Sequence, residues 1–158
     1  MITAIDTNVL LDIAGDDPEF SDMSIELLER QNSLGNLIIS PIVYSELLAF
    51  FLKRYGLQAI DKLNEFLGDS GIQILEFTME DFNLAAKIWQ NFHTKQISCP
   101  KCGTTSHFNC RKCNSQILWR NHIITDFLIG AHAQNHADSF LTRDRGYYKK
   151  YFKLKIIE

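Results

Sequence analysis

Four carboxylates are placed where they can meet at one end of a sheet. Asp6 directly follows the apolar run Ile2–Ile5, Asp144 lies just beyond a later run, and Glu46 and Asp126 fall early in helical patterns. Because ligands of open α/β sheets bind beyond the carboxyl ends of the strands, all four can face the same edge. Ionised carboxylates share a small volume only when a cation offsets their repulsion, and Mg²⁺ or Mn²⁺ prefers oxygen ligands. Such an ion activates water against a phosphodiester. Taken singly, each acid is equally well explained as a helix cap or a solvated side chain.

Strand and helix patterns alternate around these acids. Apolar runs predict strands at 2–5, 37–39, 72–77, 139–141 and 154–157. Helical spacing covers residues 20–28, 41–55, 60–67, 79–92 and 123–131, with a helical turn at 147–152. Ser40 before Pro41 is a typical helix start, and Thr78 with Asp81 resembles a capping box. The alternation predicts an α/β protein with a parallel sheet covered on both faces.

Length and composition favour one globular domain spanning residues 1–158. No apolar run reaches the roughly 20 residues of a membrane span, and the start of the chain lacks a cationic leader. We therefore expect a cytoplasmic protein without membrane contact. The net charge is −3, but residues 1–94 carry 5 Lys/Arg and 15 Asp/Glu, and residues 95–158 carry 11 and 4. A basic half can hold a polyanion while an acidic half supplies metal ligands, although uneven surface charge explains the pattern as well.

All four cysteines lie in an insert at residues 96–118, which breaks the alternation. Two residues separate the cysteines of each pair, so both thiolates can reach one tetrahedral ion. Gly103 and Asn114, which follow the second cysteine of each pair, tolerate the positive φ often needed there. We expect a structural Zn²⁺ in a small zinc-ribbon-like knuckle and regard disulfides or a rubredoxin-like iron site as the alternatives. The expected ligands are Cys99, Cys102, Cys110 and Cys113.

Four motifs, in order along the chain, resemble those of PIN-domain nucleases. They are Asp6–Leu11, Ser40–Leu47 with Glu46 on a helix, Ile124–Ala133, and Leu141–Asp144. The resemblance covers the whole chain except the cysteine insert. It implies a three-layer fold with a parallel sheet of about five strands, and an acidic site that holds one or two Mg²⁺ or Mn²⁺ ions.

The resemblance also implies roles for particular residues and partners. Asn8 and Thr142 would support the site by hydrogen bonds. Many small PIN proteins are VapC-type toxins, which cleave RNA and are silenced by a cognate antitoxin, so the resemblance implies an RNA substrate and an antitoxin partner. A homodimer is left open. The expected catalytic residues and metal ligands are Asp6, Glu46, Asp126 and Asp144.

Basic residues near the acids and in the insert are candidates for RNA contact. They are Arg143, Arg145, Lys112 and Arg120. His132 and His136 are four apart on a helix and can in principle bind metal, although such pairs usually serve packing.

Other functions fit parts of the pattern. A PIN nuclease that processes rRNA or tRNA, or a non-catalytic zinc-dependent nucleic-acid-binding module, stays an alternative to the toxin. Haloacid-dehalogenase-type phosphatases also begin with an aspartate after the first strand, but they need a second acid where this chain has Asn8.

Overall fold

A five-stranded, all-parallel sheet forms the centre of the protein. The computed structural model describes residues 1–91, 97–98, 105–106, 108–117, 125–144 and 146–158. The strand order is β3–β2–β1–β8–β9, and every neighbouring pair is parallel. The strands are β1 (Ile2–Ile5), β2 (Asn36–Ile39), β3 (Ile72–Ile74), β8 (Ser139–Leu141) and β9 (Ile156–Ile157). The prediction of an α/β fold with a five-stranded parallel sheet is confirmed.

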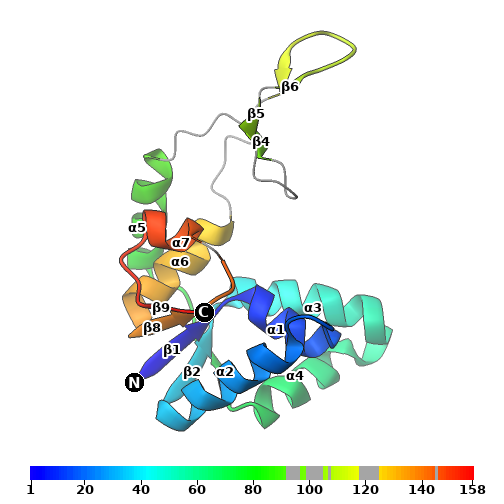
Figure 1. Ribbon diagram of the computed structural model, residues 1–158, viewed down its shortest axis with the longest axis vertical. Helices are drawn as coiled ribbons and strands as arrows, with labels where there is room; N and C mark the ends of the chain where they lie inside the picture. Colours follow the sequence, from blue (N-terminus) through cyan, green and yellow to red (C-terminus); the bar gives the residue numbers. More distant parts are fainter. Residues whose placement is uncertain (92–96, 99–104, 107, 118–124, 145) are drawn as a thin grey trace.

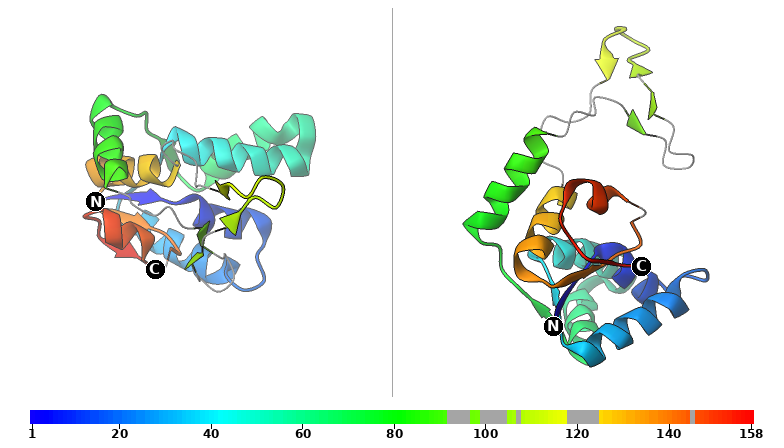
Figure 2. Two further views of the ribbon diagram at one scale, coloured as in Figure 1. Left: turned by 90° about the horizontal axis from the view of Figure 1, so that it is seen from above. Right: turned by 60° about the vertical axis from the view of Figure 1, so that its left-hand side comes forward.

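Helices cover both faces of this sheet. Figure 1 labels the helices, and the left view of Figure 2 shows that α3, α5 and α6 lie on one side of β1 and α2 and α7 on the other. The helices are α1 (Thr7–Gly15), α2 (Ser21–Leu34), α3 (Pro41–Tyr55), α4 (Ala59–Asp69), α5 (Met79–Gln90), α6 (Thr125–His136) and α7 (Tyr147–Tyr151), with a 3₁₀ turn at Gly56–Gln58.

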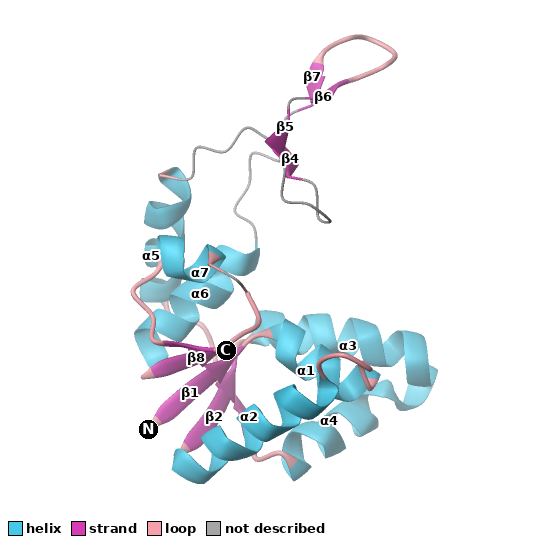
Figure 3. Cartoon of the chain, viewed as in Figure 1, coloured by secondary structure: helices cyan, strands magenta, loops and turns pink. Residues whose placement is uncertain are grey.

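The central strand β1 pairs with a parallel strand on each side. Thr3 pairs with Leu37 of β2 on one side and with Ser139 of β8 on the other, and β1 is buried except at its first residue. Because the strands are parallel, their carboxyl ends lie along one edge of the sheet, visible in Figure 3 where the magenta strands converge. Asp6 and Thr142 follow β1 and β8 at this edge.

Local capping explains where the helices begin. The Ser40 hydroxyl accepts a hydrogen bond from the N–H of Val43, and Pro41 takes the first helical position of α3. Thr78 and Asp81 form the predicted capping box at the start of α5. The core between the layers includes the fully buried Phe127 of α6 and Phe140 of β8.

The cysteine-containing insert lies between α5 and α6. Its described residues form two small antiparallel pairs, β4 (Ile97–Ser98) with β5 (Thr105–Ser106), and β6 (Phe108–Asn109) with β7 (Gln116–Ile117). Figures 1 and 2 draw both pairs away from the central sheet. Cys99, Cys102, Arg120 and Arg145 lie outside the described residues.

Several elements differ from the sequence prediction, and three of them bear on the sheet and the acid edge. The helix α1 was not predicted, and Asp6 is its N-cap residue. The strands expected at 72–77 and 154–157 are shorter, because β3 and β9 lie at the two edges of the sheet and pair on one side only. Among the described residues, no helix has the length and apolar character needed to cross a membrane.

Candidate functional site

Four elements bring the predicted acids to the carboxyl edge of the sheet. Asp6 lies between β1 and α1, Glu46 in α3, Asp126 in the first turn of α6, and Asp144 in the loop after β8. The N–H of Asp6 donates to the carbonyl of Leu141 over 2.9 Å, so the loop after β8 begins directly beside it. The four acids therefore share one edge, as the parallel topology predicts.

Asp6 is fixed by hydrogen bonds on both carboxylate oxygens. Its Oδ1 accepts from the N–H of Thr7 at 2.8 Å and so caps α1. Its Oδ2 accepts from the Thr142 hydroxyl at 2.6 Å and from the Asn8 amide at 2.8 Å. Asn8 and Thr142 therefore both hydrogen-bond to Asp6, the contact expected of supporting residues.

The Thr142 hydroxyl connects Asp6 with the loop that carries Asp144. Besides donating to Asp6, its oxygen accepts from the N–H of Asp144 at 3.0 Å and from the Asn8 amide at 3.2 Å. The Asp144 carboxylate in turn accepts from the N–H of Gly146 at 2.9 Å. Thr142 is 1% exposed, so this network is shielded from competing water.

Burial and like charge make Asp6 a poor acid. Desolvation raises the pKa of Asp6 to about 6, against the opposing hydrogen bonds from Thr142 and Thr7. The negative charges of Asp126 and Glu46 raise the pKa further. A carboxylate buried among other carboxylates is the electrostatic situation that a cation relieves.

Asp126 and Glu46 lie close enough to Asp6 for their charges to affect its pKa. Desolvation raises the pKa of Asp126, and the charges of Glu46 and Asp144 add to the rise. The Thr7 hydroxyl donates to the Glu46 carboxylate, which ties α3 to the start of α1. Within the described part of the chain, however, no three His, Cys, Asp or Glu side chains are close enough together to bind one metal ion directly.

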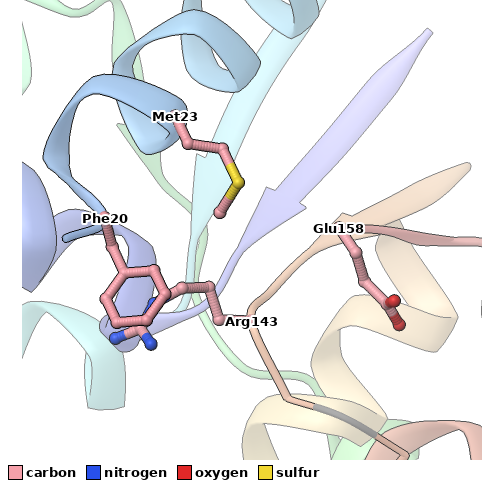
Figure 4. Close-up of a pocket in the computed structure, with 4 residues that line it drawn as sticks. All are labelled: Phe20, Met23, Arg143 and Glu158. Carbon is pink, nitrogen blue, oxygen red and sulfur yellow. The ribbon is translucent and has the colours of Figure 1, made fainter.

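Arg143, a candidate for RNA contact, makes an ion pair with Asp12 of α1. Its Nε and one terminal nitrogen donate to the two Asp12 oxygens at 2.6 and 2.7 Å. The guanidinium carbon lies 4.1 Å from the centre of the Phe20 ring. A pocket of about 200 Å³ opens beside this pair, lined by Phe20, Met23, Arg143 and Glu158 (Figure 4).

The two histidines of α6 have protein partners. His132 contacts the carbonyl oxygen of Leu75 at 2.9 Å, and His136 contacts the Asp81 carboxylate at the same distance. Asp81 is completely buried and also accepts from Asn135. These contacts favour the packing interpretation of the histidine pair.

Cys110 and Cys113, two of the four predicted zinc ligands, lie within the described residues. Cys110 and Cys113 enclose a tight turn in which the N–H of Asn114 donates to the Cys110 carbonyl at 2.8 Å. Asn114 has a φ of +56°, as expected for the residue after the second cysteine. The Ser115 hydroxyl, at 3.0 Å from the Cys113 sulfur, together with Cys110 lowers the pKa of the Cys113 thiol. A bound zinc stays a prediction.

Sequence reasoning missed two residues that hold the site together. Thr7 and Asp12 lie on α1, which was not predicted, and each bonds a residue far along the chain. Recognising a helix directly after Asp6 would have placed Thr7 and Asp12 on α1. It would not have indicated that they bond Glu46 and Arg143. Of the other RNA-contact candidates, Lys112 is exposed in the cysteine turn.

Comparison with known families and structures agrees with this architecture. Residues 3–153 match the PIN domain family. The chain belongs to the PIN domain family. No curated protein matches the sequence.

Several solved structures share the fold at low sequence identity. One is the complex VapBC2 from Rickettsia felis bound to a promoter DNA fragment, with 22% identity, a TM-score of 0.64, and coverage of 99% of this chain and 98% of that chain. Another is VapBC-1 from nontypeable Haemophilus influenzae, with 17% identity, a TM-score of 0.65, and coverage of 100% and 98%. A third is VapC20 of Mycobacterium tuberculosis, described as a toxin that cleaves the sarcin-ricin loop, with 11% identity, a TM-score of 0.54, and coverage of 97% and 98%.

Proposed function

We propose that this protein is a Mg²⁺- or Mn²⁺-dependent endoribonuclease. The observation that carries the proposal is the cluster of Asp6, Glu46, Asp126 and Asp144 at the carboxyl edge of a PIN-domain sheet, where neighbouring carboxylate charges add to the rise that burial causes in the pKa of Asp6 and of Asp126. The oxygen donors fit a hard divalent ion. Mg²⁺ keeps several of its waters and needs only one or two direct carboxylates, so acids too far apart to share one ion directly can still bind its waters.

The residues at this edge have separate roles in the proposed reaction. When bound, the ion supplies a water of lowered pKa and stabilises charge on the phosphodiester. Thr142 and Asn8 hold the Asp6 carboxylate in one orientation through two hydrogen bonds to its Oδ2. Asp126 is exposed and can face an incoming RNA backbone. We assign metal binding and orientation of the attacking water to Asp6, Glu46, Asp126 and Asp144.

The test is cleavage of single-stranded RNA with Mn²⁺ and with EDTA. Wild-type protein should cut only with the ion, and Asp126→Asn should lose cleavage while keeping its unfolding midpoint. Asp22→Asn is the matched control, because this aspartate is exposed in the first turn of α2 and should not affect activity. Equal cleavage by wild type and Asp126→Asn would remove the acid cluster from the chemistry.

We further propose that the nuclease acts as the toxin of a type II toxin–antitoxin pair. The support is the likeness in fold to structures titled as VapBC complexes and to a VapC toxin. Expression of the chain should arrest growth, expression of Asp126→Asn should not, and co-expression of a small neighbouring gene should restore growth. A nuclease that processes rRNA or tRNA would instead be tolerated without a partner. The cytoplasmic location and a homodimer stay predictions.

The insert is proposed to hold one structural Zn²⁺ through Cys99, Cys102, Cys110 and Cys113. The support is the turn at Cys110–Cys113, the positive φ of Asn114, and the lowered pKa of the Cys113 thiol, since thiolates are the metal-binding form. Elemental analysis should find one zinc per chain in wild type and in Lys112→Gln, and none in Cys113→Ser. Freshly purified wild type without zinc would refute the assignment. RNA contact by Lys112, Arg120 and Arg145 stays a prediction.

A further inference from the structure

The ion pair between Asp12 and Arg143 is more completely enclosed than a surface contact. Asp12 is 4% exposed, and both of its oxygens accept from the guanidinium at 2.6 and 2.7 Å. Phe20 covers the guanidinium plane at 4.1 Å. A planar guanidinium that is held along one edge by two hydrogen bonds and on one face by an aromatic ring has a fixed orientation.

The pair joins the loop of the acid site to two helices. Asp12 lies on α1, whose first residue follows Asp6, and it also accepts from the Ser24 hydroxyl of α2 at 2.9 Å. The N–H of Arg143 donates to the Asn8 side chain at 3.2 Å. Both neighbours of Arg143 in the chain, Thr142 and Asp144, belong to the acid network. The ion pair that fixes Arg143 therefore also fixes the loop from which Thr142 donates to Asp6.

We infer that Asp12 and Arg143 are positioning residues for the acid site. Their ion pair fixes residues 142–144 against α1, which keeps the Thr142 hydroxyl on Asp6 and keeps Asp144 on the same edge. The inference rests on the proposed function and gives Arg143 a role different from RNA contact. A phosphate that bound the same edge of the guanidinium would have to displace a buried bidentate carboxylate, and the displaced Asp12 would then be a buried charge without its partner.

The two roles predict opposite behaviour for Asp12. If Arg143 bound RNA, neutralising Asp12 would release a positive charge and would preserve or tighten RNA binding. If the pair positions the loop, removing either partner disturbs the same contact. Residues that orient metal ligands typically change metal affinity or activity 10–100-fold when mutated. Because the two side chains act as one unit, the double variant should be no worse than either single variant.

The experiment is calorimetric titration of metal-free protein with Mn²⁺. Asp12→Asn, Arg143→Gln and the double variant should each lose about tenfold in Mn²⁺ affinity, within the range typical of such residues. Arg143→Lys keeps the charge but loses the second hydrogen bond, so it should fall between wild type and Arg143→Gln. Arg30→Gln is the matched control, since Arg30 is exposed on α2 and should bind Mn²⁺ like wild type.

Steady-state cleavage of single-stranded RNA gives the second measurement. The positioning role predicts a lower kcat with little change in KM for both Asp12→Asn and Arg143→Gln. A raised KM in Arg143→Gln together with normal activity in Asp12→Asn would overturn it in favour of RNA contact. Unchanged Mn²⁺ affinity in both variants would overturn it as well.

Failure of this inference can be told apart from failure of the proposed function. Wild type that neither binds Mn²⁺ nor cuts RNA would defeat both. Wild type that does both, beside variants that behave identically to it, would defeat the positioning role alone. If a single variant fails to fold, Arg143→Lys and Ser24→Ala, which removes only one bond to Asp12, still decide the question through the same titration.

Discussion

Replacing Asp6 with asparagine should stabilise the metal-free protein at alkaline pH. Burial raises the pKa of this carboxyl from its ordinary 3.8 to about 6. The folded protein therefore holds the Asp6 proton more tightly than the unfolded chain does. The stability that this contributes is fully present below about pH 3.8 and is lost as the pH rises through about 6. Above that pH, folding must bury an ionised group.

The size of the effect follows from the shift. Each pKa unit corresponds to about 1.4 kcal/mol, so the full difference for Asp6 is about 3 kcal/mol. Asparagine is neutral at every pH and can still cap α1, but it loses a hydrogen bond from Thr142 or Asn8 worth about 1 kcal/mol. At about pH 8 the variant should be more stable by about 2 kcal/mol. Near pH 4 the advantage should vanish.

Urea unfolding in EDTA at several pH values measures this difference. Between about pH 5 and pH 8, the free energy of unfolding of Asp6→Asn relative to wild type should rise by about 1.4 kcal/mol, close to half of the full effect. Asp22→Asn, at an exposed position, should show no such trend. A difference between Asp6→Asn and wild type that stays constant over this range would refute the reasoning that burial disfavours the charge of Asp6.

Further predictions concern packing and the buried carboxylate of Asp81. Alanine at Gly130 would place a Cβ within 2.5 Å of the Phe152 ring, so Gly130→Ala should cost about 2 kcal/mol in urea unfolding. Gly68→Ala, on a helix with nothing within 4 Å, should instead gain up to about 1 kcal/mol, and equal effects at both sites would contradict the packing argument. Asp81→Ala leaves His136 and the N–H of Thr78 without their acceptor and should cost about 3 kcal/mol, whereas an unchanged midpoint would show that water replaces the carboxylate.

The acid edge could be predicted from the sequence because it depends on short-range signals. Ser40 and Pro41 mark the start of α3 through local capping, and this places Glu46 in its second turn. Asp6 directly follows the apolar run Ile2–Ile5, which was predicted to be a buried strand. Parallel topology then brings the ends of the strands together without any knowledge of side-chain contacts.

The contacts that hold the edge in place could not be predicted in this way. Asp12 and Arg143 are separated by 131 positions, and nothing in the spacing of either residue indicates the other. The helix α1 was missed for a related reason. Its cap is the same Asp6 carboxylate that was interpreted as a ligand, so one residue carries two signals and only one was considered.

The central place of β1 has a consequence for synthesis of the protein. Thr3 pairs with Ser139, so one edge of β1 stays uncovered until β8 has been synthesised. Asp126 and Asp144 also emerge from the ribosome long after Asp6. A chain that ends before α6 therefore lacks Asp126 and Asp144 and leaves β1 unpaired on one side, so the acid edge is complete only after the loop that follows β8 has been synthesised.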